Sequence, residues 1–428
     1  MVAFLLVLVV VLAVLGGVHW YVWRRLVRDV TVAGGLPRRL GTVAVVALPL
    51  LSLAALTSSR AGAPFWFQQV VAWPGFLWLA LLLYVTLALV VGEAVRPVLR
   101  ARLERRAKAA VPAEVAAPAS VPVPVSVPDS VPDAVTTASP AEAAPPAAEA
   151  PVDVSRRLFV SRVVGGSAAA VALGTVGYGA YGVLRGPRVK RVTVPLAKLS
   201  RAAHGYRIAV VSDIHLGPIL GRAHSQRIVD AINSTQPDLI AIVGDLVDGT
   251  VENLGPAAEP LARLRARHGS FFVTGNHEYF SGADAWVDHV RELGLRPLRN
   301  ERVEIAAGFD LAGVDDVAGE SEGRGPDFGR ALGDRDRARA AVLLAHQPIV
   351  IHDAVRNGVD LQLSGHTHGG QLWPGNYLAE LANPTVAGLE QYGDTQLYVS
   401  RGAGAWGPPV RVGAPSDITI VELASKQA

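Results

Sequence analysis

The chain has 428 residues, 50% of them hydrophobic, a formal net charge of +3 and no cysteine. The lack of cysteine excludes disulfides and leaves nitrogen and oxygen as the ligands for any metal. So small a net charge does not favour nucleic-acid binding, and none is expected. Basic residues cluster beside apolar segments instead, which indicates membrane topology.

Four apolar segments come close to the roughly 20 residues that a membrane-spanning helix needs. They are Phe4–Trp23, Leu40–Thr57, Gly75–Val95 and Val163–Leu184. A cleaved signal peptide does not suit the first segment, because arginines follow it and none precedes it. We therefore predict three transmembrane helices within residues 1–95 and a fourth within residues 155–185.

The distribution of arginine predicts the orientation of these helices, because positive charge marks the cytoplasmic side. Arginine is frequent after the first and third segments, whereas the loop between the second and third carries only Arg60. This predicts a multi-pass protein of the cell membrane with a cytoplasmic linker and a globular domain on the outer face. Arg188, Lys190 and Arg191, beyond the fourth segment, argue mildly for the opposite direction.

The region between the third and fourth segments has two distinct features. Residues 96–154 are basic at first and then rich in Pro and Ala without a period, which predicts a disordered linker. Ser155-Arg156-Arg157-Leu158-Phe159-Val160 resembles a twin-arginine export signal, which would make the twin-arginine export machinery a partner. The alternative is that these arginines only anchor the helix at the inner face.

Residues 186–428 have the pattern of an α/β domain. Short apolar runs predict strands at Ile208–Val211, Leu239–Val243 and Phe271–Val273, and helices are predicted at Arg222–Asn233, Ala257–Arg267 and Ala283–Leu293. Such alternation predicts parallel β-α-β units. Six later runs without clear helices between them predict a second sheet packed on the first: Val303–Ile305, Asp310–Gly313, Ala341–Leu344, Leu361–Leu363, Leu397–Val399 and Ile418–Val421.

Short polar signatures follow most of these strands. They are Asp213-Ile214-His215, Gly244-Asp245, Gly275-Asn276-His277-Glu278, Ala345-His346-Gln347 and Gly365-His366-Thr367-His368-Gly369-Gly370. Active groups gather at the carboxyl ends of parallel strands, so we expect these side chains to meet. Asp245, between an Asp/His pair and an Asn, is predicted to bridge two cations. One cation would bind Asp213, His215, Asp245 and His368, and the other Asp245, Asn276, His346 and His366.

Imidazole combined with carboxylate favours Mn, Zn or Fe over Ca or Mg, so two such divalent ions are the predicted cofactors. A hydroxide held between them, formed near neutral pH, is the predicted nucleophile. His277 is adjacent to a ligand but is not needed as one, and is the candidate catalytic acid. Asp248 and Glu278 are candidates for support of the ligands. Arg401 and Arg411 have two readings, contact with a phosphate or structural pairing.

The ordered series resembles the calcineurin-like metallophosphoesterases, whose pattern is D-x-H, G-D, G-N-H-[ED], a lone His and G-H-x-H. The match covers about Tyr206–Gln371, and every metal and acid position is present. Three later segments resemble a bacterial membrane-associated branch: Gly369-Gly370-Gln371, Ser400–Gly404 and Pro415-Ser416-Asp417-Ile418. The resemblance implies a four-layer α-β-β-α sandwich. It disfavours a protein phosphatase, because Gly249-Thr250 follows Asp248 where those enzymes carry Arg-Gly.

The sequence thus predicts a membrane-anchored, metal-dependent phosphoric ester hydrolase that acts on a phosphate ester or pyrophosphate. A lipid-linked substrate fits a tethered site, which meets membrane substrates at high effective concentration. One alternative is a tethered phosphodiesterase or nucleotidase for soluble substrates. The other is a non-enzymatic, metal-stabilised membrane scaffold, which would have no use for the spare His277.

Overall fold

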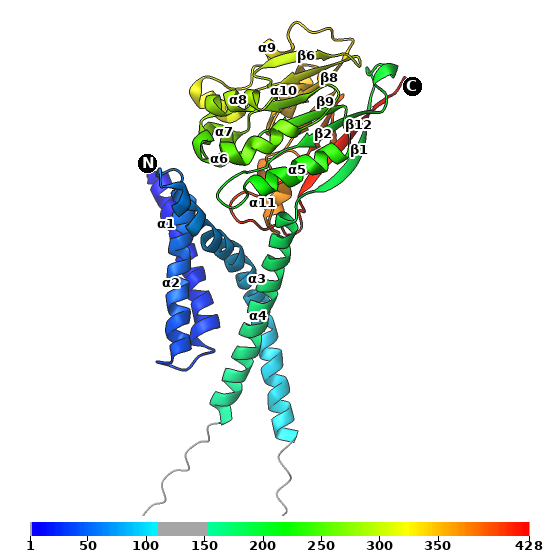
Figure 1. Cartoon of the computed structure of the whole chain (residues 1–428). Helices are drawn as coiled ribbons and strands as arrows, with labels where there is room; N and C mark the ends of the chain where they lie inside the picture. The colour runs from blue at the N-terminus through cyan, green and yellow to red at the C-terminus, as the bar shows by residue number, and fades with distance from the viewer. Residues whose placement is uncertain (1, 110–151, 428) are drawn as a thin grey trace, which may run out of the picture.

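The computed structural model describes residues 2–109 and 152–427. Four long helices form a bundle at one end of the molecule, and the domain that follows them lies at the other (Figure 1). All four are long and apolar enough to cross a membrane. Their bounds are α1 (Val2–Trp23), α2 (Leu36–Thr57), α3 (Phe65–Ala109) and α4 (Val152–Leu184), with a π-helical turn at Arg24–Arg28 after α1.

The helices differ from the predicted segments mainly where the linker was expected. α3 continues as one helix to Ala109, through basic residues that the prediction gave to a disordered linker over 96–154. The run Arg100–Lys108 is polar but rich in strong helix formers, so it prolongs a helix that the apolar segment has already nucleated. α4 begins at Val152 and includes the twin-arginine-like residues. Residues 110–151 of the predicted linker lie outside the described residues.

Small residues let the bundle helices approach closely. A Cβ on Gly75 of α3 would overlap the carbonyl of Leu51 in α2, and one on Gly92 would overlap Val164 of α4. Ser52 also donates a hydrogen bond of 2.7 Å to the carbonyl oxygen of Gly75. Close backbone approach and interhelical hydrogen bonds are what hold helices together in lipid.

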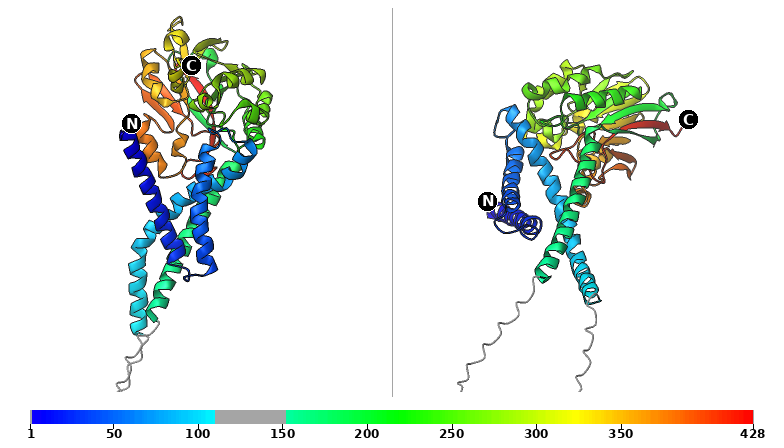
Figure 2. Two further views of the ribbon diagram at one scale, coloured as in Figure 1. Left: turned by 90° about the vertical axis from the view of Figure 1, so that its left-hand side faces the viewer. Right: turned by 60° about the horizontal axis from the view of Figure 1, so that its bottom comes forward.

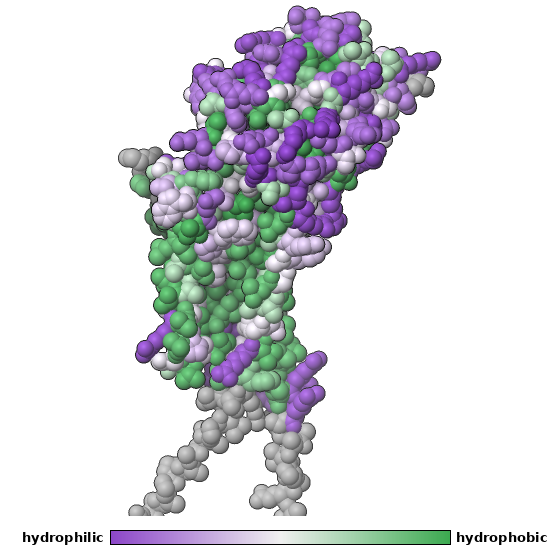
Figure 3. Space-filling view, in the orientation of Figure 1, coloured by the Kyte–Doolittle hydropathy of each residue, from purple (hydrophilic) through white to green (hydrophobic). Residues whose placement is uncertain are grey.

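The bundle has two distinct ends. α1 begins at the end next to the domain, and the connection from α1 to α2 lies at the opposite end (Figures 1 and 2). At that far end Arg25 donates to Glu93 of α3 at 2.8 Å and to Asp29 at 3.0 Å. Figure 3 shows an apolar band along the bundle between this level and the polar domain.

The first sheet has the strand order β1-β12-β2-β3-β4-β5. Neighbouring strands run parallel except β12 and β2, which are antiparallel. The bounds are β1 (Arg188–Leu196), β2 (Tyr206–Val211), β3 (Leu239–Val243), β4 (Ser270–Val273), β5 (Arg296–Pro297) and β12 (Asp417–Ser425). β2, β3 and β4 therefore direct their carboxyl ends to the same edge, as the β-α-β pattern predicted.

The second sheet has the order β10-β11-β9-β8-β7-β6, with antiparallel pairs only at its two edges. The bounds are β6 (Glu301–Ile305), β7 (Phe309–Gly313), β8 (Ala340–Leu344), β9 (Leu361–Ser364), β10 (Gly388–Tyr392) and β11 (Thr395–Val399). Five of the six later apolar runs are strands here, whereas the sixth, Ile418–Val421, belongs to β12 in the first sheet.

The two sheets pack face to face with helices on both outer sides. Apolar residues of both sheets, such as Val210, Leu311 and Leu363, share one buried cluster between them. Helices α5 (Arg222–Ser234), α6 (Val251–Ala258) and α8 (Ala283–Glu292) contribute residues to a second cluster outside the first sheet. Helices α9 (Phe328–Leu332) and α10 (Ile351–Arg356) contribute to a third outside the second sheet. This is the predicted four-layer α-β-β-α sandwich.

One predicted helix is wrong. Ala257–Arg267 is not a helix: α6 ends at Ala258, a 3-10 turn covers Glu259–Arg263, and Leu264 is extended. Pro260 explains part of this, because proline supplies no backbone N–H within a helix. The apolar residues of this stretch, including Leu261, still pack on the first sheet.

The bundle and the domain are joined by side-chain packing as well as by the chain. Leu372, Val410 and Val412 of the domain belong to the apolar cluster of the bundle. Tyr84 of α3 donates a hydrogen bond of 3.0 Å to the carbonyl oxygen of Trp373. On α4, a Cβ on Gly179 would overlap Val410 and Arg411, so the helix touches the domain there without a side chain between them.

Candidate metal centre

The predicted ligands come from five strand ends in two sheets. Asp213 and His215 follow β2, Asp245 follows β3, and Asn276 opens α7 (Asn276–Ser281) just after β4. His346 follows β8, while His366 and His368 follow β9. The carboxyl ends of these strands meet along one edge of the sandwich, so Asp213 and His368, 155 positions apart in the chain, lie in one cluster.

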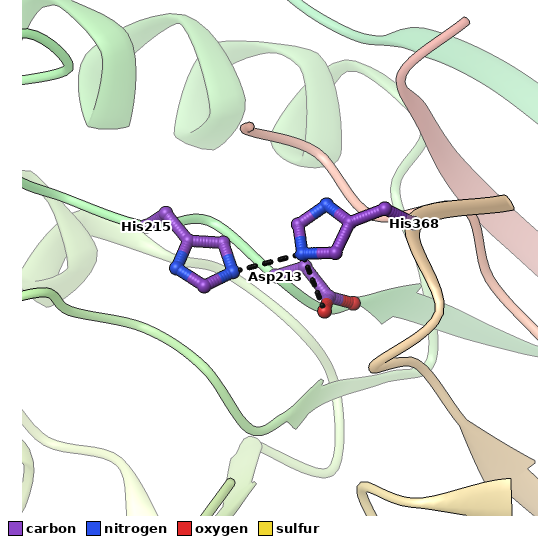
Figure 4. Close-up of side chains that lie close together, drawn as sticks. All are labelled: Asp213, His215 and His368. Atoms are coloured by element: carbon purple, nitrogen blue, oxygen red, sulfur yellow. Dashed lines mark hydrogen bonds and ion pairs between the residues drawn. The ribbon is translucent and has the colours of Figure 1, made fainter. Parts of the chain in front are cut away.

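The first predicted group is assembled around Asp213. The Nε2 atoms of His215 and His368 lie 3.0 Å apart, and His368 Nε2 is 3.3 Å from Asp213 Oδ1 (Figure 4). These three side chains form one of the clusters with ligand atoms within 4.8 Å of one another. His215 Nε2 also lies 3.6 Å from Asp245 Oδ2, which connects this group to the next.

The second predicted group surrounds Asp245. His346 Nε2 is 3.2 Å from Asp245 Oδ2, and both residues cluster with His366. Nδ1 of His366 lies 3.0 Å from Oδ1 of Asn276. Asp245 thus stands between the two groups, the position predicted for the bridging carboxylate.

The ring orientations fit a pair of bound cations. Nδ1 of His346 donates to the carbonyl oxygen of Val243 at 2.9 Å, so a neutral ring carries its lone pair on Nε2. That Nε2 is buried and forms no hydrogen bond within the described part of the chain. A buried ring nitrogen that faces a carboxylate without a hydrogen bond is costly as a neutral group, and either a proton or a bound cation satisfies it. The oxygen and nitrogen donors are of the type that Mn, Zn and Fe accept.

Strained backbone brings the ligands together. Asp213, His215, Asp245, His366 and His368 all have positive φ values between 48° and 72°. Non-glycine residues adopt this left-handed region at a cost that clusters at functional sites. Glycine is required beside them: a Cβ on Gly275 would overlap the carboxylate of Asp245, and one on Gly365 would overlap Asp213.

Asp248 holds two of the imidazoles. Its Oδ1 lies 3.0 Å from Nδ1 of His215 and 2.6 Å from Nδ1 of His277. Burial opposes ionisation of this carboxyl, but the charges and hydrogen bonds of His215 and His277 outweigh it and lower the pKa of Asp248 to about 2. The carboxylate therefore directs Nε2 of both rings away from itself, as a partner behind a ligand does.

Glu278 supports the backbone rather than the ligands' side chains. Its carboxylate accepts hydrogen bonds from the N–H groups of Gly275, Asp245 and Leu246, at 2.6, 3.0 and 2.8 Å. Burial, and then the charge of Asp245, raise the pKa of Glu278 to about 7. Glu278 thus ties the end of β3 to the start of α7, which sets the spacing between Asp245 and Asn276.

The predicted catalytic residue, His277, lies at the edge of the cluster and is not one of its buried members. One of its ring nitrogens is within the third cluster of possible ligands, with His215 and Asp245. Phe280 and Trp406 each contact its ring edge to face, with centroids 5.5 and 5.8 Å away. The sequence patterns did not indicate these two aromatic neighbours: Phe280 lies just beyond the Gly275–Glu278 signature, and Trp406 lies in the irregular loop that follows Ser400–Gly404.

The two arginines with open roles differ in the structure. The buried Arg411 donates to Nδ1 and to the carbonyl oxygen of His368, both at 3.0 Å, and to Gly404 at 2.7 Å. Arg411 is therefore engaged in structural pairing with a predicted ligand. Arg401 lies beside Gly369 and is partly exposed.

Asp315, just after the end of β7, pairs with Arg299 at 2.5 Å and is in none of the clusters of possible ligands.

Electrostatics within the cluster keep some imidazoles protonated and others neutral. Burial would lower the pKa of His215, but Asp248 and then Asp245 raise it to about 9. Burial, together with the charge of His346, lowers the pKa of His366 to about 4. Burial and the nearby His215 and Arg411 likewise hold the pKa of His368 well below its usual range. Cation binding therefore displaces protons from this site, as expected for imidazole ligands.

The role of Asp248 can be tested by metal titration of the full chain in detergent. We expect Asp248→Asn to weaken metal binding about 10- to 100-fold, because His215 and His277 lose the carboxylate that orients them. Asp316→Asn is the matched control: Asp316 is also buried beside the site, and its Oδ1 contacts with Ala318 and Gln347 survive in the amide. An equal loss in both variants would attribute the effect to charge alone and contradict the role of Asp248.

Comparisons with known proteins agree with this geometry. Residues 206–370 match the family described as calcineurin-like phosphoesterase. The chain is 39% identical over 264 residues to a Danio rerio protein named "Transmembrane protein with metallophosphoesterase domain", and the match spans 59% of this chain and 60% of that one. It is 38% identical over 260 residues to an "Uncharacterized metallophosphoesterase" of Helicobacter pylori, which spans 59% of this chain and 69% of the relative.

A relative in Aquifex aeolicus, also named "Uncharacterized metallophosphoesterase", is 36% identical over 243 residues, which are 56% of this chain and 92% of that one. These bacterial relatives agree with the predicted bacterial branch. The fold, the motif series and these identities lead to one conclusion. The chain belongs to the calcineurin-like metallophosphoesterase family.

Proposed function

We propose that this protein is a membrane-anchored phosphoesterase with two divalent metal ions, which hydrolyses a phosphate ester or a pyrophosphate. The observation that carries the proposal is the convergence of seven predicted ligands: Asp213, His215, Asp245, Asn276, His346, His366 and His368. Asp245 stands between two groups of donors, and His277 lies beside both Asp245 and His215. A scaffold would need the donors but would have no use for the additional histidine.

The residues of the chain have separate roles in this reaction. Two bound cations would polarise the phosphoryl group and supply a nucleophile from water near neutral pH. His277 is at the rim of the cluster, where it can donate a proton to the leaving oxygen. Asp248 keeps Nδ1 of His277 engaged and so leaves Nε2 to face the substrate. Strand ends and buried hydrogen bonds hold the donors in place, so little reorganisation is needed during the reaction.

The surroundings of His277 support an amphiphilic, lipid-linked substrate. Phe280 is 62% exposed and Trp406 52% exposed, although both flank the proposed acid. Arg60, in the loop between α2 and α3, places its guanidinium 5.8 Å from the centre of the Phe280 ring. Gly407, next to Trp406, lies close to Phe76 of α3. Exposed aromatic side chains next to membrane-spanning helices favour a substrate that carries an apolar group.

The placement of the domain on the outer face is also part of this proposal. The basic connection between α1 and α2 and the basic end of α3 lie away from the domain, at the end of the bundle where Arg25 meets Glu93. Positive charge at that end supports its cytoplasmic placement, and hence an outer domain. The basic residues after α4 favour the opposite orientation, but the preference of positive charge for the cytoplasmic side is weak next to large translocated domains.

The proposed activity is tested with the full chain in detergent, loaded with Mn, Zn or Fe. We expect metal-dependent turnover of a phosphate diester, a monoester or a pyrophosphate-linked lipid, and complete loss of it in Asp245→Asn with the circular dichroism spectrum retained. We expect His277→Ala to keep its metal content but to lose about 10²- to 10⁴-fold in kcat. That loss should be largest for poor leaving groups, which depend on an acid, and small for p-nitrophenolate.

Three results would contradict the proposal. Turnover of none of these substrates, or unchanged turnover in Asp245→Asn, would exclude the two-metal reaction. A fall in metal content in His277→Ala that matches its loss of activity would make His277 a ligand instead of an acid.

The substrate class is tested by two substitutions at the rim. We expect Phe280→Ser and Trp406→Ser to raise KM for a pyrophosphate-linked lipid about tenfold, the effect of about 1.4 kcal/mol of lost apolar contact. KM for a small soluble diester should stay the same. Leu389→Ser, a similar change at an exposed position on the edge strand β10, is the control and should alter neither value. Equal effects on both substrates would favour the tethered phosphodiesterase or nucleotidase.

Topology is tested by a reporter fused after Ala428. A reporter that is active only outside the cytoplasm should be active in this fusion, whereas one that is active only in the cytoplasm should be silent. The reverse pattern would overturn the outer placement. Replacing Arg156 and Arg157 by lysine in the same fusion separates export from anchoring, because a twin-arginine route should fail and an ordinary anchored helix should not.

A further inference from the structure

A cavity of about 350 Å³ lies where the last turns of α4 meet the segment Arg411–Ser416. Tyr178, Tyr181 and Arg185 line it from α4, and Arg188 lines it from the start of β1. The domain side contributes Arg411 and Ser416. The cavity does not include any of the predicted metal ligands, and its volume falls within the range of small-ligand sites.

The neighbours of the cavity place it at the surface of the membrane. Tyr178 is 75% exposed and Tyr181 61% exposed, at the end of the apolar part of α4. Tyrosine is typical of the boundary between lipid and water, and arginine follows it at the level of the headgroups. Because Tyr178, Tyr181 and Arg185 line the cavity just before the chain passes from α4 to β1, the cavity lies at the level expected for that boundary.

Helix α11 also indicates that this part of the domain lies at the membrane surface. Helix α11 (Gly375–Ala382) has no buried residue, and Tyr377, Leu378 and Leu381 are exposed on it. The segment before it is joined to the wall of the cavity, since Leu372 pairs with Val412. An apolar helix surface next to membrane-spanning helices is typical of an interfacial helix. The cavity and α11 therefore face the same side of the domain.

The lining of the cavity suits a phosphate group. Three arginines line it; Arg411 is already hydrogen-bonded to His368 and Gly404, which leaves Arg185 and Arg188, and none of the described lining residues is acidic. Ser416 is only 4% exposed, and its Oγ has no hydrogen-bond partner among the described residues. A buried hydroxyl without a partner is costly unless a ligand or water satisfies it. Guanidinium groups with a hydroxyl donor are a common combination for binding phosphate.

We propose that this cavity binds the headgroup of an anionic phospholipid, with Arg185, Arg188 and Ser416 facing its phosphate and the acyl chains lying along α4 beside Tyr178. The lipid is a bound partner and not the substrate, because the cavity does not reach His277. Arg411 connects the two sites, since it lines the cavity and also donates to His368. The proposal goes beyond the proposed phosphoesterase activity and depends only on the placement of α4 in a membrane.

Lipid binding by the full chain in nonionic detergent tests the proposal. The probes are phosphatidylglycerol and phosphatidylcholine with the same fluorescent acyl chain, and inorganic phosphate serves as competitor. We expect phosphatidylglycerol to bind more tightly than phosphatidylcholine. Arg188→Gln should weaken this binding about fivefold, the contribution of one basic residue at a membrane surface. Arg191→Gln, three residues along β1 and outside the cavity, is the matched control and should not weaken it.

A second pair of variants tests whether the lipid occupies the cavity, because one of them fills it with a larger side chain. A Cβ on Gly182 or on Gly177 of α4 would meet nothing within 4 Å, so both positions accept a larger side chain. Gly182 lines the cavity and Gly177 does not. Gly182→Leu should therefore abolish the preference for phosphatidylglycerol, and Gly177→Leu should retain it.

Each remaining outcome would overturn the proposal. Equal affinity for the two lipids would exclude recognition of the anionic headgroup. Equal weakening in test and control variants would attribute binding to the general surface charge or to the bundle. Competition by inorganic phosphate at the concentration of the lipid would identify a site for free phosphate. Because binding is the readout, a failure here and a failure of the phosphoesterase assay are separate results.

Discussion

The carboxylate of Asp245 is the point on which the rest of the site depends. It is buried, and it meets His346 at 3.2 Å, His215 at 3.6 Å and the backbone N–H of His277 at 2.9 Å. Burial alone would keep this carboxyl neutral, but the charges of His346 and His215 hold its pKa well below the usual range. A buried charge is tolerated only where partners surround it on every side. β3 and β8, from different sheets, therefore have to meet here, and the packing of the two sheets has to support this contact.

The same requirement explains why so much of the surrounding structure is buried and polar. Glu278 accepts three backbone N–H groups around Asp245, and Asp248 holds the rings of His215 and His277. Neither residue belongs to a cluster of possible ligands, yet both hold groups that do. A network of this kind is stable when each member is satisfied and fails when one partner is lost. Nε2 of His346 is the exception: it lies 3.2 Å from the carboxylate of Asp245 but forms no hydrogen bond within the described residues, and it is the atom that a bound cation would complete.

The sequence predicted best those elements whose structure depends on residues close together in the chain. Strands β2, β3 and β4 were predicted almost to the residue, because apolar runs end abruptly at Asp213, Asp245 and Asn276. The division of the predicted ligands between two cations followed from the order of the motifs along the chain. β1, by contrast, was missed, because its pattern is mostly exposed and it depends on pairing with β12 more than 220 residues away. The helix predicted at Ala257–Arg267 is wrong for a similar reason. A 3-10 turn over Glu259–Arg263 buries the same apolar residues, so their spacing alone did not distinguish it from an α-helix.

Contacts that join the site to the helical bundle could not be predicted, because they lie in the irregular loop between β11 and β12. That loop carries Trp406 to His277, Val410 into the apolar cluster of the bundle, and Arg411 to His368. No periodicity marks these positions, since a loop has none. Three residues within six positions nevertheless touch the proposed acid, the helices of the bundle and a predicted ligand. Gly179 of α4 packs against Val410 and Arg411, so the bundle contacts the same loop that reaches His368. The candidate metal centre is thus connected, through Arg411, to helices that contribute no predicted ligand to it.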